Sequence, residues 1–257
     1  MKDARGLDVT GNDAAAVAAA DDFAARLLRL DQGVEAILDA AKRWPDTPIV
    51  QLYAAAFWLY GQTEGAIENA AAHLRAGDAL AMNARERALH RALALWHGND
   101  NLRAVEALEA ITTEWPSDLL TAKIAEFLYY VLGQQYMGPR FRAHMRRLEG
   151  AHADDPDFLA MAAFASELCG DSVAAEAVAE RALTIEPRNP WAQHALSHVL
   201  IRQGRVREGL ARLEAFLPLL ATCGRPIHCH DAWHLALLHL EELDVAAAMR
   251  VFNTKSH

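Results

Sequence analysis

Residues 156–189 constrain the fold of this chain most strongly, because they form a unit of two amphipathic runs that the following residues repeat. Gly170 separates the two runs of this unit. The next unit, residues 190–224, has the same plan, and its glycine, Gly204, follows Gly170 by 34 residues. Apolar residues recur every three or four positions in each run, which predicts an amphipathic helix.

A 34-residue unit of two helices joined by a short turn is typical of the tetratricopeptide repeat (TPR). Only a neighbouring hairpin can cover the apolar face of such a unit, so the hairpins stack into an array. The sequence therefore predicts an all-α fold, a TPR-like superhelical solenoid of about seven antiparallel helix pairs. We expect one domain over residues 1–257, in which 156–189 and 190–224 are the clearest repeats. The pairs are expected at 13–29 and 31–44, 48–61 and 63–76, 84–97 and 101–115, 117–132 and 137–150, the two runs of 156–189, 191–203 and 206–217, and 228–242 and 245–253.

Composition agrees with helices and argues against a nucleic acid partner. Much of the 53% hydrophobic fraction is alanine, which has the highest helix propensity and lets helices approach closely. The formal net charge is −9, and such a surface repels a phosphate backbone unless a basic patch intervenes. The arginines within 140–147 form a basic helix face, which we interpret as solvent-exposed.

Three further features predict a cytoplasmic protein without a membrane partner. No apolar run approaches the ~18–20 residues that a membrane span requires. Residues 1–22 lack the basic start and apolar core of a signal peptide. The three cysteines, Cys169, Cys223 and Cys229, form no CxxC pair, so a disulfide framework is not expected.

Two histidine pairs mark the candidate site. His194 and His198 stand at i, i+4, and so do His230 and His234, which places each pair on one face of its helix. The pairs lie on the first helices of consecutive hairpins. If the turn at Gly204 corresponds to Leu243, the pairs differ by one position around their helices and can face one shared site.

Imidazole pairs at this spacing are common ligands of transition metal ions. The predicted ligand site comprises His194, His198, His230, His234, Glu167, Trp191 and Trp233, of which the four histidines are the candidate metal ligands. Glu167 and Asp231, with Glu241 and Glu242, are carboxylates that could complete a metal site. The alternative is that the histidines are polar core residues that hydrogen-bond to backbone carbonyls and to one another.

No catalytic residue can be assigned from the sequence. The first pair, His194-Ala-Leu-Ser-His198, lacks the glutamate of the HExxH hydrolase motif, and the second has Asp231 in that place. No P-loop, GxGxxG loop or GxSxG elbow is present. Cys229, between two histidines, is interpreted as a small buried residue rather than a nucleophile.

The segments that hold the two pairs, Trp191 to Leu200 and His230 to Leu237, resemble the tetratricopeptide repeat protein 38 family. Upstream segments at 85–87, 118–123 and 163–167 fit the same pattern, so the resemblance spans roughly 80–245. Family members carry Asn-Trp where this chain has Asp-Ala at 231–232, and they continue beyond the end of this chain. The resemblance implies a TPR-like solenoid that lacks the family's C-terminal part. It carries no assigned activity.

The sequence favours binding over catalysis. A helical array without a catalytic motif is typical of a scaffold that binds proteins or ligands on its concave face. A metal-binding protein or metal-dependent enzyme built on the four histidines is the main alternative, and a metal-free small-molecule site is a third. No cofactor is expected apart from such a metal ion. Met249 and Phe252, on the last helix, predict contact with a partner protein or with a second copy through the C-terminal hairpin.

Overall fold

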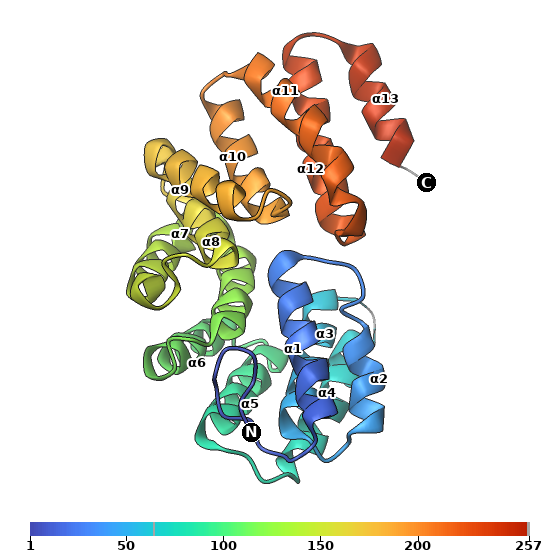
Figure 1. The fold of residues 1–257 in the computed structure, drawn as a ribbon, viewed down its shortest axis with the longest axis vertical. Helices are drawn as coiled ribbons and strands as arrows, with labels where there is room; N and C mark the ends of the chain where they lie inside the picture. The colour runs from blue at the N-terminus through green and yellow to red at the C-terminus, as the bar shows by residue number, and fades with distance from the viewer. Residues whose placement is uncertain (64, 256–257) are drawn as a thin grey trace. The chain divides into compact units, whose positions relative to one another are not determined.

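The computed structural model describes residues 1–63 and 65–255, and those residues form helices joined by turns and short loops. Thirteen α-helices and one 3₁₀-helix follow one another along the described residues (Figure 1). Backbone pairing of the β type there is limited to two isolated bridges. The predicted all-α fold is therefore confirmed.

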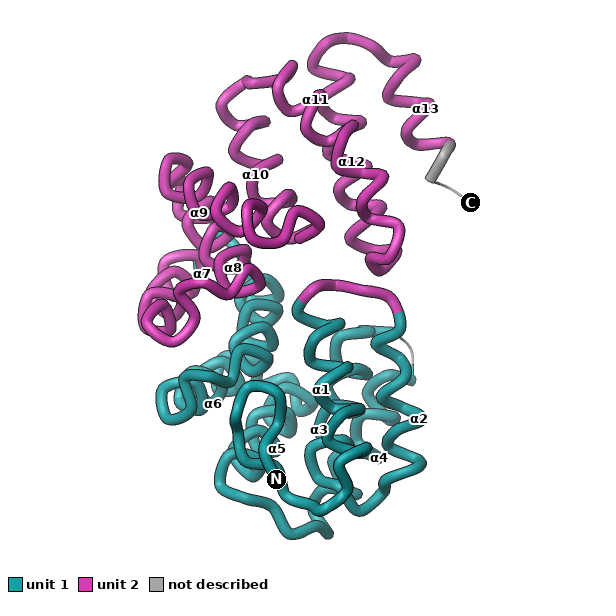
Figure 2. Tube along the Cα trace, in the orientation of Figure 1, with its two compact units in different colours: residues 1–28, 33–137 teal, residues 29–32, 138–257 magenta. Residues whose placement is uncertain are grey.

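The chain divides into two compact units (Figure 2). Unit 1 comprises residues 1–28 and 33–137, and unit 2 comprises residues 29–32 and 138–257. Each unit is described separately below. A single cooperative domain over the whole chain stays a prediction.

Unit 1 consists of helices joined by short turns, and from α2 to α6 each helix contacts the next. Its first six helices are α1 (Ala14–Arg29), α2 (Ala36–Arg43), α3 (Pro48–Gly61), α4 (Ala66–Asp78), α5 (Ala84–His97) and α6 (Asn101–Glu114). Trp44 and Trp115 follow α2 and α6 with nearly the same backbone angles, φ −124° and −123°. Each precedes a proline, which disfavours helical backbone at the preceding residue. The two Trp-Pro steps are thus equivalent repeat ends.

Two predicted helix starts in unit 1 are wrong. The second helix begins at Ala36 and not at position 31, because Gly33 takes a φ of 89° that a helix does not allow. The fourth begins at Ala66 and not at position 63, because Gly65 before it has a φ of 78°. In both places a left-handed glycine sets the start of the helix more strongly than the side-chain pattern does.

The predicted fourth pair is one kinked element, α7 (Leu119–His152). Only Gly133 departs from helical backbone inside it, with φ 113° and ψ 107°. The expected linker over 133–136 is therefore wrong, and the break occupies a single residue. Glycine can absorb such a break because it has no Cβ to oppose a positive φ.

Beyond α7, unit 2 contains three helix pairs in sequence. Its elements are α8 (Pro156–Leu168), α9 (Ser172–Ile185), α10 (Pro190–Arg202), α11 (Val206–Phe216), the 3₁₀-helix η1 (Leu217–Thr222), α12 (Arg225–Glu241) and α13 (Val245–Lys255). The first helices of successive pairs contact one another, α8 with α10 and α10 with α12. The sequence did not predict η1, and α12 begins three residues earlier than expected.

The turns inside these pairs are closed in the same way. Gly170, Gly204 and Leu243 have φ values of 74°, 64° and 59°. The N–H of the residue after each of them donates to the carbonyl five residues earlier, at 2.9–3.0 Å. This pattern is the Schellman motif, which ends helices with a left-handed residue. The predicted turns at Gly170 and Gly204 and the match of Gly204 with Leu243 are confirmed.

The last pair leaves apolar side chains on the surface. Met249 and Phe252 of α13 are 50% and 66% exposed, and Val245 is 60% exposed. This exposure agrees with the prediction for the final helix. None of the helices in the described residues has the length and apolarity needed to cross a membrane.

Candidate functional site: a four-histidine cluster

The candidate site lies in unit 2, between α10 and α12. The start of α10 is fixed by Asn189, whose side chain accepts a hydrogen bond from the backbone N–H of Ala192 at 2.9 Å, and by Pro190 in the first turn. A proline in the first turn also begins α12. Residues four apart share a helix face, so α10 presents its two histidines toward α12, and α12 presents its two toward α10.

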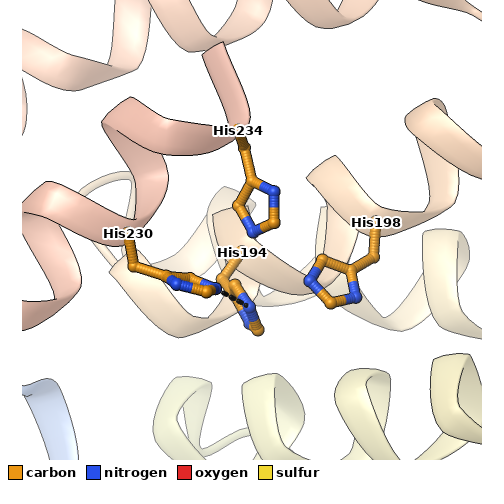
Figure 3. Close-up of side chains that lie close together, drawn as sticks. All are labelled: His194, His198, His230 and His234. Atoms are coloured by element: carbon orange, nitrogen blue, oxygen red, sulfur yellow. Dashed lines mark hydrogen bonds between the residues drawn. The ribbon is translucent and has the colours of Figure 1, made fainter. Parts of the chain in front are cut away.

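Four imidazoles converge at this point (Figure 3). One ligand atom from each of His194, His198, His230 and His234 lies within 4.8 Å of all the others. We call these residues the four-histidine cluster. The Nε2 atoms of His194 and His230 are 3.1 Å apart in a hydrogen bond, and neighbouring ring centroids are separated by 4.4–5.3 Å. The spatial convergence predicted from the sequence is confirmed, and ligand binding there stays a prediction.

His234 is the most unusual member of the cluster. Its side chain is 2% exposed, and neither ring nitrogen has a hydrogen-bond partner among the described residues. Burial, followed by the charges of His198 and His230, lowers the pKa of His234 to about 3. The ring is therefore neutral near pH 7, and a neutral imidazole has a nitrogen lone pair to offer.

The cluster opens toward solvent at His230, which is exposed, whereas His194 is 3% exposed. Partial burial, followed by the charge of His198, lowers the pKa of His230. The lowered pKa values of His230 and His234 favour unprotonated forms of these two rings at neutral pH.

Aromatic side chains border the cluster on two sides. Trp191 stacks on His194 with centroids 4.5 Å apart and an interplanar angle of 17°. Trp233 is 53% exposed, and its ring centroid lies 5.1 Å from that of His234. The sequence did not assign Phe164 to the site, yet its ring lies 5.1 Å from that of His194. Its position three residues before Glu167, on the same face of α8, was the available signal.

Glu167 lies behind His198. Its side chain is 1% exposed, and its Oε2 is 3.4 Å from Nδ1 of His198. The other oxygen, Oε1, is 2.9 Å from Nη2 of Arg202. Both contacts have ion-pair distances without the angles of well-directed hydrogen bonds. Arg202 was not predicted, although it follows His198 by four residues and so shares its helix face.

The other candidate carboxylates lie outside the cluster. Asp231 is fully buried, and burial raises its pKa well above the usual range. Asp231 is not among the residues whose ligand atoms form the cluster. Glu241 and Glu242 are exposed. The suggestion that one of these three completes the site is therefore wrong in this arrangement. Cys229 is partly exposed and also stands outside the cluster.

Comparison with known proteins bears on the fold. A crystal structure of MamA protein, a TPR-like protein, is similar to this chain with a TM-score of 0.50 and 12% sequence identity. The similarity covers 66% of this chain and 89% of that one. This chain has a TPR-like fold. At such low identity the similarity extends to the fold alone. No family model matches the sequence.

In this TPR-like fold, the cluster combines four nitrogen donors with no carboxylate or thiolate in the same group. Hard ions such as Mg²⁺ and Ca²⁺ prefer oxygen ligands. Imidazole suits zinc, copper, nickel and iron. The donor set therefore suits a transition metal ion better than an alkaline-earth ion.

Proposed function

We propose that this TPR-like protein binds a divalent transition metal ion at the four-histidine cluster. One observation carries the proposal: four ligand atoms lie within 4.8 Å of one another.

The alternative, a purely structural polar core, leaves His234 unexplained. Buried polar groups in proteins are almost always hydrogen-bonded, and an unsatisfied one costs about 1–3 kcal/mol. Both ring nitrogens of His234 are without a hydrogen-bond partner among the described residues. A metal ion between α10 and α12 would give one of these nitrogens a partner.

The proposal is tested by metal analysis of protein purified without a histidine tag. We expect stoichiometric zinc, cobalt, nickel or copper by elemental analysis, and loss of it in His230→Ala. His230 is suited to substitution because its side chain is exposed. His97→Ala is the matched control, since His97 lies in unit 1 and contacts the Ile67 carbonyl at 3.2 Å. Zinc affinity that is unchanged in His230→Ala would refute the proposal.

A second candidate function is favoured by the fold. TPR-like arrays commonly act as scaffolds that bind proteins or peptides, and the exposed Met249 and Phe252 of α13 offer an apolar surface for such a partner. The two functions are compatible, because α13 carries none of the four histidines. We also propose a cytoplasmic setting, since the three cysteines are free thiols, as is usual in a reducing compartment.

A further inference from the structure

We propose that Glu167 is a positioning residue for the metal site. It holds His198 in the tautomer that carries its proton on Nδ1, so that Nε2 of this ring faces the ion. This inference rests on the proposed metal-binding function. It replaces the expectation that Glu167 itself ligates the metal.

The contact between α8 and α10 provides the geometry. Oε2 of Glu167 is 3.4 Å from Nδ1 of His198. In Figure 3, one ring nitrogen of His198 points toward the other imidazoles and the other points away from them. A carboxylate can only accept hydrogen bonds, so this contact is attractive when the proton of the imidazole is on Nδ1. The neutral ring then has its lone pair on Nε2.

Burial protects the contact between Glu167 and His198 from water. Glu167 is 1% exposed, so water does not compete for its oxygens as it would at the surface. A buried carboxylate requires a compensating charge, and Arg202 supplies it at 2.9 Å from Oε1. Glu167 thus links Arg202 to His198, which is the member of the cluster that it contacts.

A role as a direct ligand fits less well. Glu167 is not among the residues whose ligand atoms lie within 4.8 Å of one another. Each of its two oxygens is already in contact with a positively charged or N–H-bearing group. In proteins, metal-binding histidines commonly donate their second N–H to a carboxylate, and removal of that carboxylate weakens metal binding by about 10- to 100-fold.

The first experiment measures zinc affinity by competition with a chromophoric chelator. We expect Glu167→Gln to weaken zinc binding about 10- to 100-fold with unchanged helicity by circular dichroism. Glu176→Gln is the matched control, because Glu176 lies outside the cluster. Its Oε2 contacts Nη1 of Arg205 at 2.7 Å. Equal zinc affinity in Glu167→Gln and the wild type overturns the inference.

The second experiment reads the tautomer directly. In ¹⁵N-histidine-labelled wild-type protein, long-range ¹H–¹⁵N correlation should show His198 protonated at Nδ1, both without metal and with zinc bound. Protonation at Nε2 instead overturns the inference even where Glu167→Gln fails to fold.

His230→Ala separates the two proposals. If it abolishes zinc binding while Glu167→Gln does not weaken it, the metal site stands and the role of Glu167 falls.

Discussion

Gly204 and Leu243 take the same left-handed backbone conformation, with φ of 64° and 59°, at the corresponding turns of consecutive helix pairs. The N–H groups of Arg205 and Asp244, which follow them, each donate to the carbonyl five residues earlier at 2.9 Å. Because the turns match, the register of α12 follows that of α10. This register brings His234 of one helix beside His194 of the other.

Replacing Gly204 by alanine should destabilise the protein by about 1 kcal/mol. A Cβ at this position meets nothing within 4 Å, so the expected loss comes from the left-handed backbone alone. Urea denaturation measures it. Gly150→Ala is the control, because Gly150 lies within α7 without a positive φ and also has open space around it. That control should gain about 0.5–1 kcal/mol. Equal effects of the two substitutions would contradict the turn assignment.

The converse substitution, Leu243→Gly, should stabilise the protein. Leu243 holds a φ of 59° that side chains other than glycine, asparagine and aspartate rarely adopt. Its side chain is 85% exposed, so little apolar burial is lost on its removal. We expect a gain of up to about 1 kcal/mol in the free energy of unfolding. A loss of stability would show that the leucine side chain makes contacts that outweigh the backbone strain.

How far the sequence predicts this fold depends on which residues end its helices. The 34-residue spacing of Gly170 and Gly204 predicted the hairpins of unit 2 because left-handed glycines end helices in a recognisable way. Gly133 misled the prediction because it bends α7 without ending it. A glycine in a sequence shows where a break is permitted, and its neighbours in space decide how long the break becomes.

The candidate site was predictable as far as helical periodicity reaches. Spacing of four residues placed each histidine pair on one face, and turn matching placed the two pairs together. Glu167 and Arg202 show the limit of that reasoning. Whether Glu167 ligates an ion or stands behind His198 depends on the packing of α8 against α10, a contact between separate hairpins that periodicity within one helix does not encode.

Zinc should raise the stability of the wild-type protein and leave His230→Ala unaffected. A ligand that binds only the folded state at 100 times its dissociation constant adds about 2.7 kcal/mol to the free energy of unfolding. Urea titrations with zinc, and with zinc plus a chelator, measure the effect. The same gain in His230→Ala would mean that zinc binds elsewhere on the chain.

Stability of the metal-free protein should respond to pH through His234. The pKa of this ring is about 3 in the folded state, against an ordinary value of 6.5. Between these values the unfolded chain binds a proton that the folded chain does not. The contribution of His234 therefore destabilises the fold as pH falls through this window. Asp231, whose pKa is raised, contributes with the opposite sign.

Comparison of the wild type with His234→Gln isolates the histidine contribution. Urea denaturation gives the free energy of unfolding at pH values of about 7 and 5. This free energy should fall more between the two pH values in the wild type than in His234→Gln. Asp231 is present in both proteins, so its opposing contribution cancels in the difference. Equal drops would show that His234 titrates normally in the folded state.

The exposed face of α13 should mediate self-association. Met249 is 50% exposed and Val245, one helical turn earlier, is 60% exposed, and burial of a side chain such as methionine contributes about 1.5–3 kcal/mol. We expect sedimentation equilibrium to detect a dimer at high protein concentration. Met249→Asp should raise the dissociation constant of the dimer at least about tenfold. A tenfold change corresponds to about 1.4 kcal/mol of binding free energy. Ala246→Asp, at another exposed position of α13, is the control for added charge. A wild-type protein that stays monomeric at every concentration would leave α13 as a surface for a different partner and refute self-association.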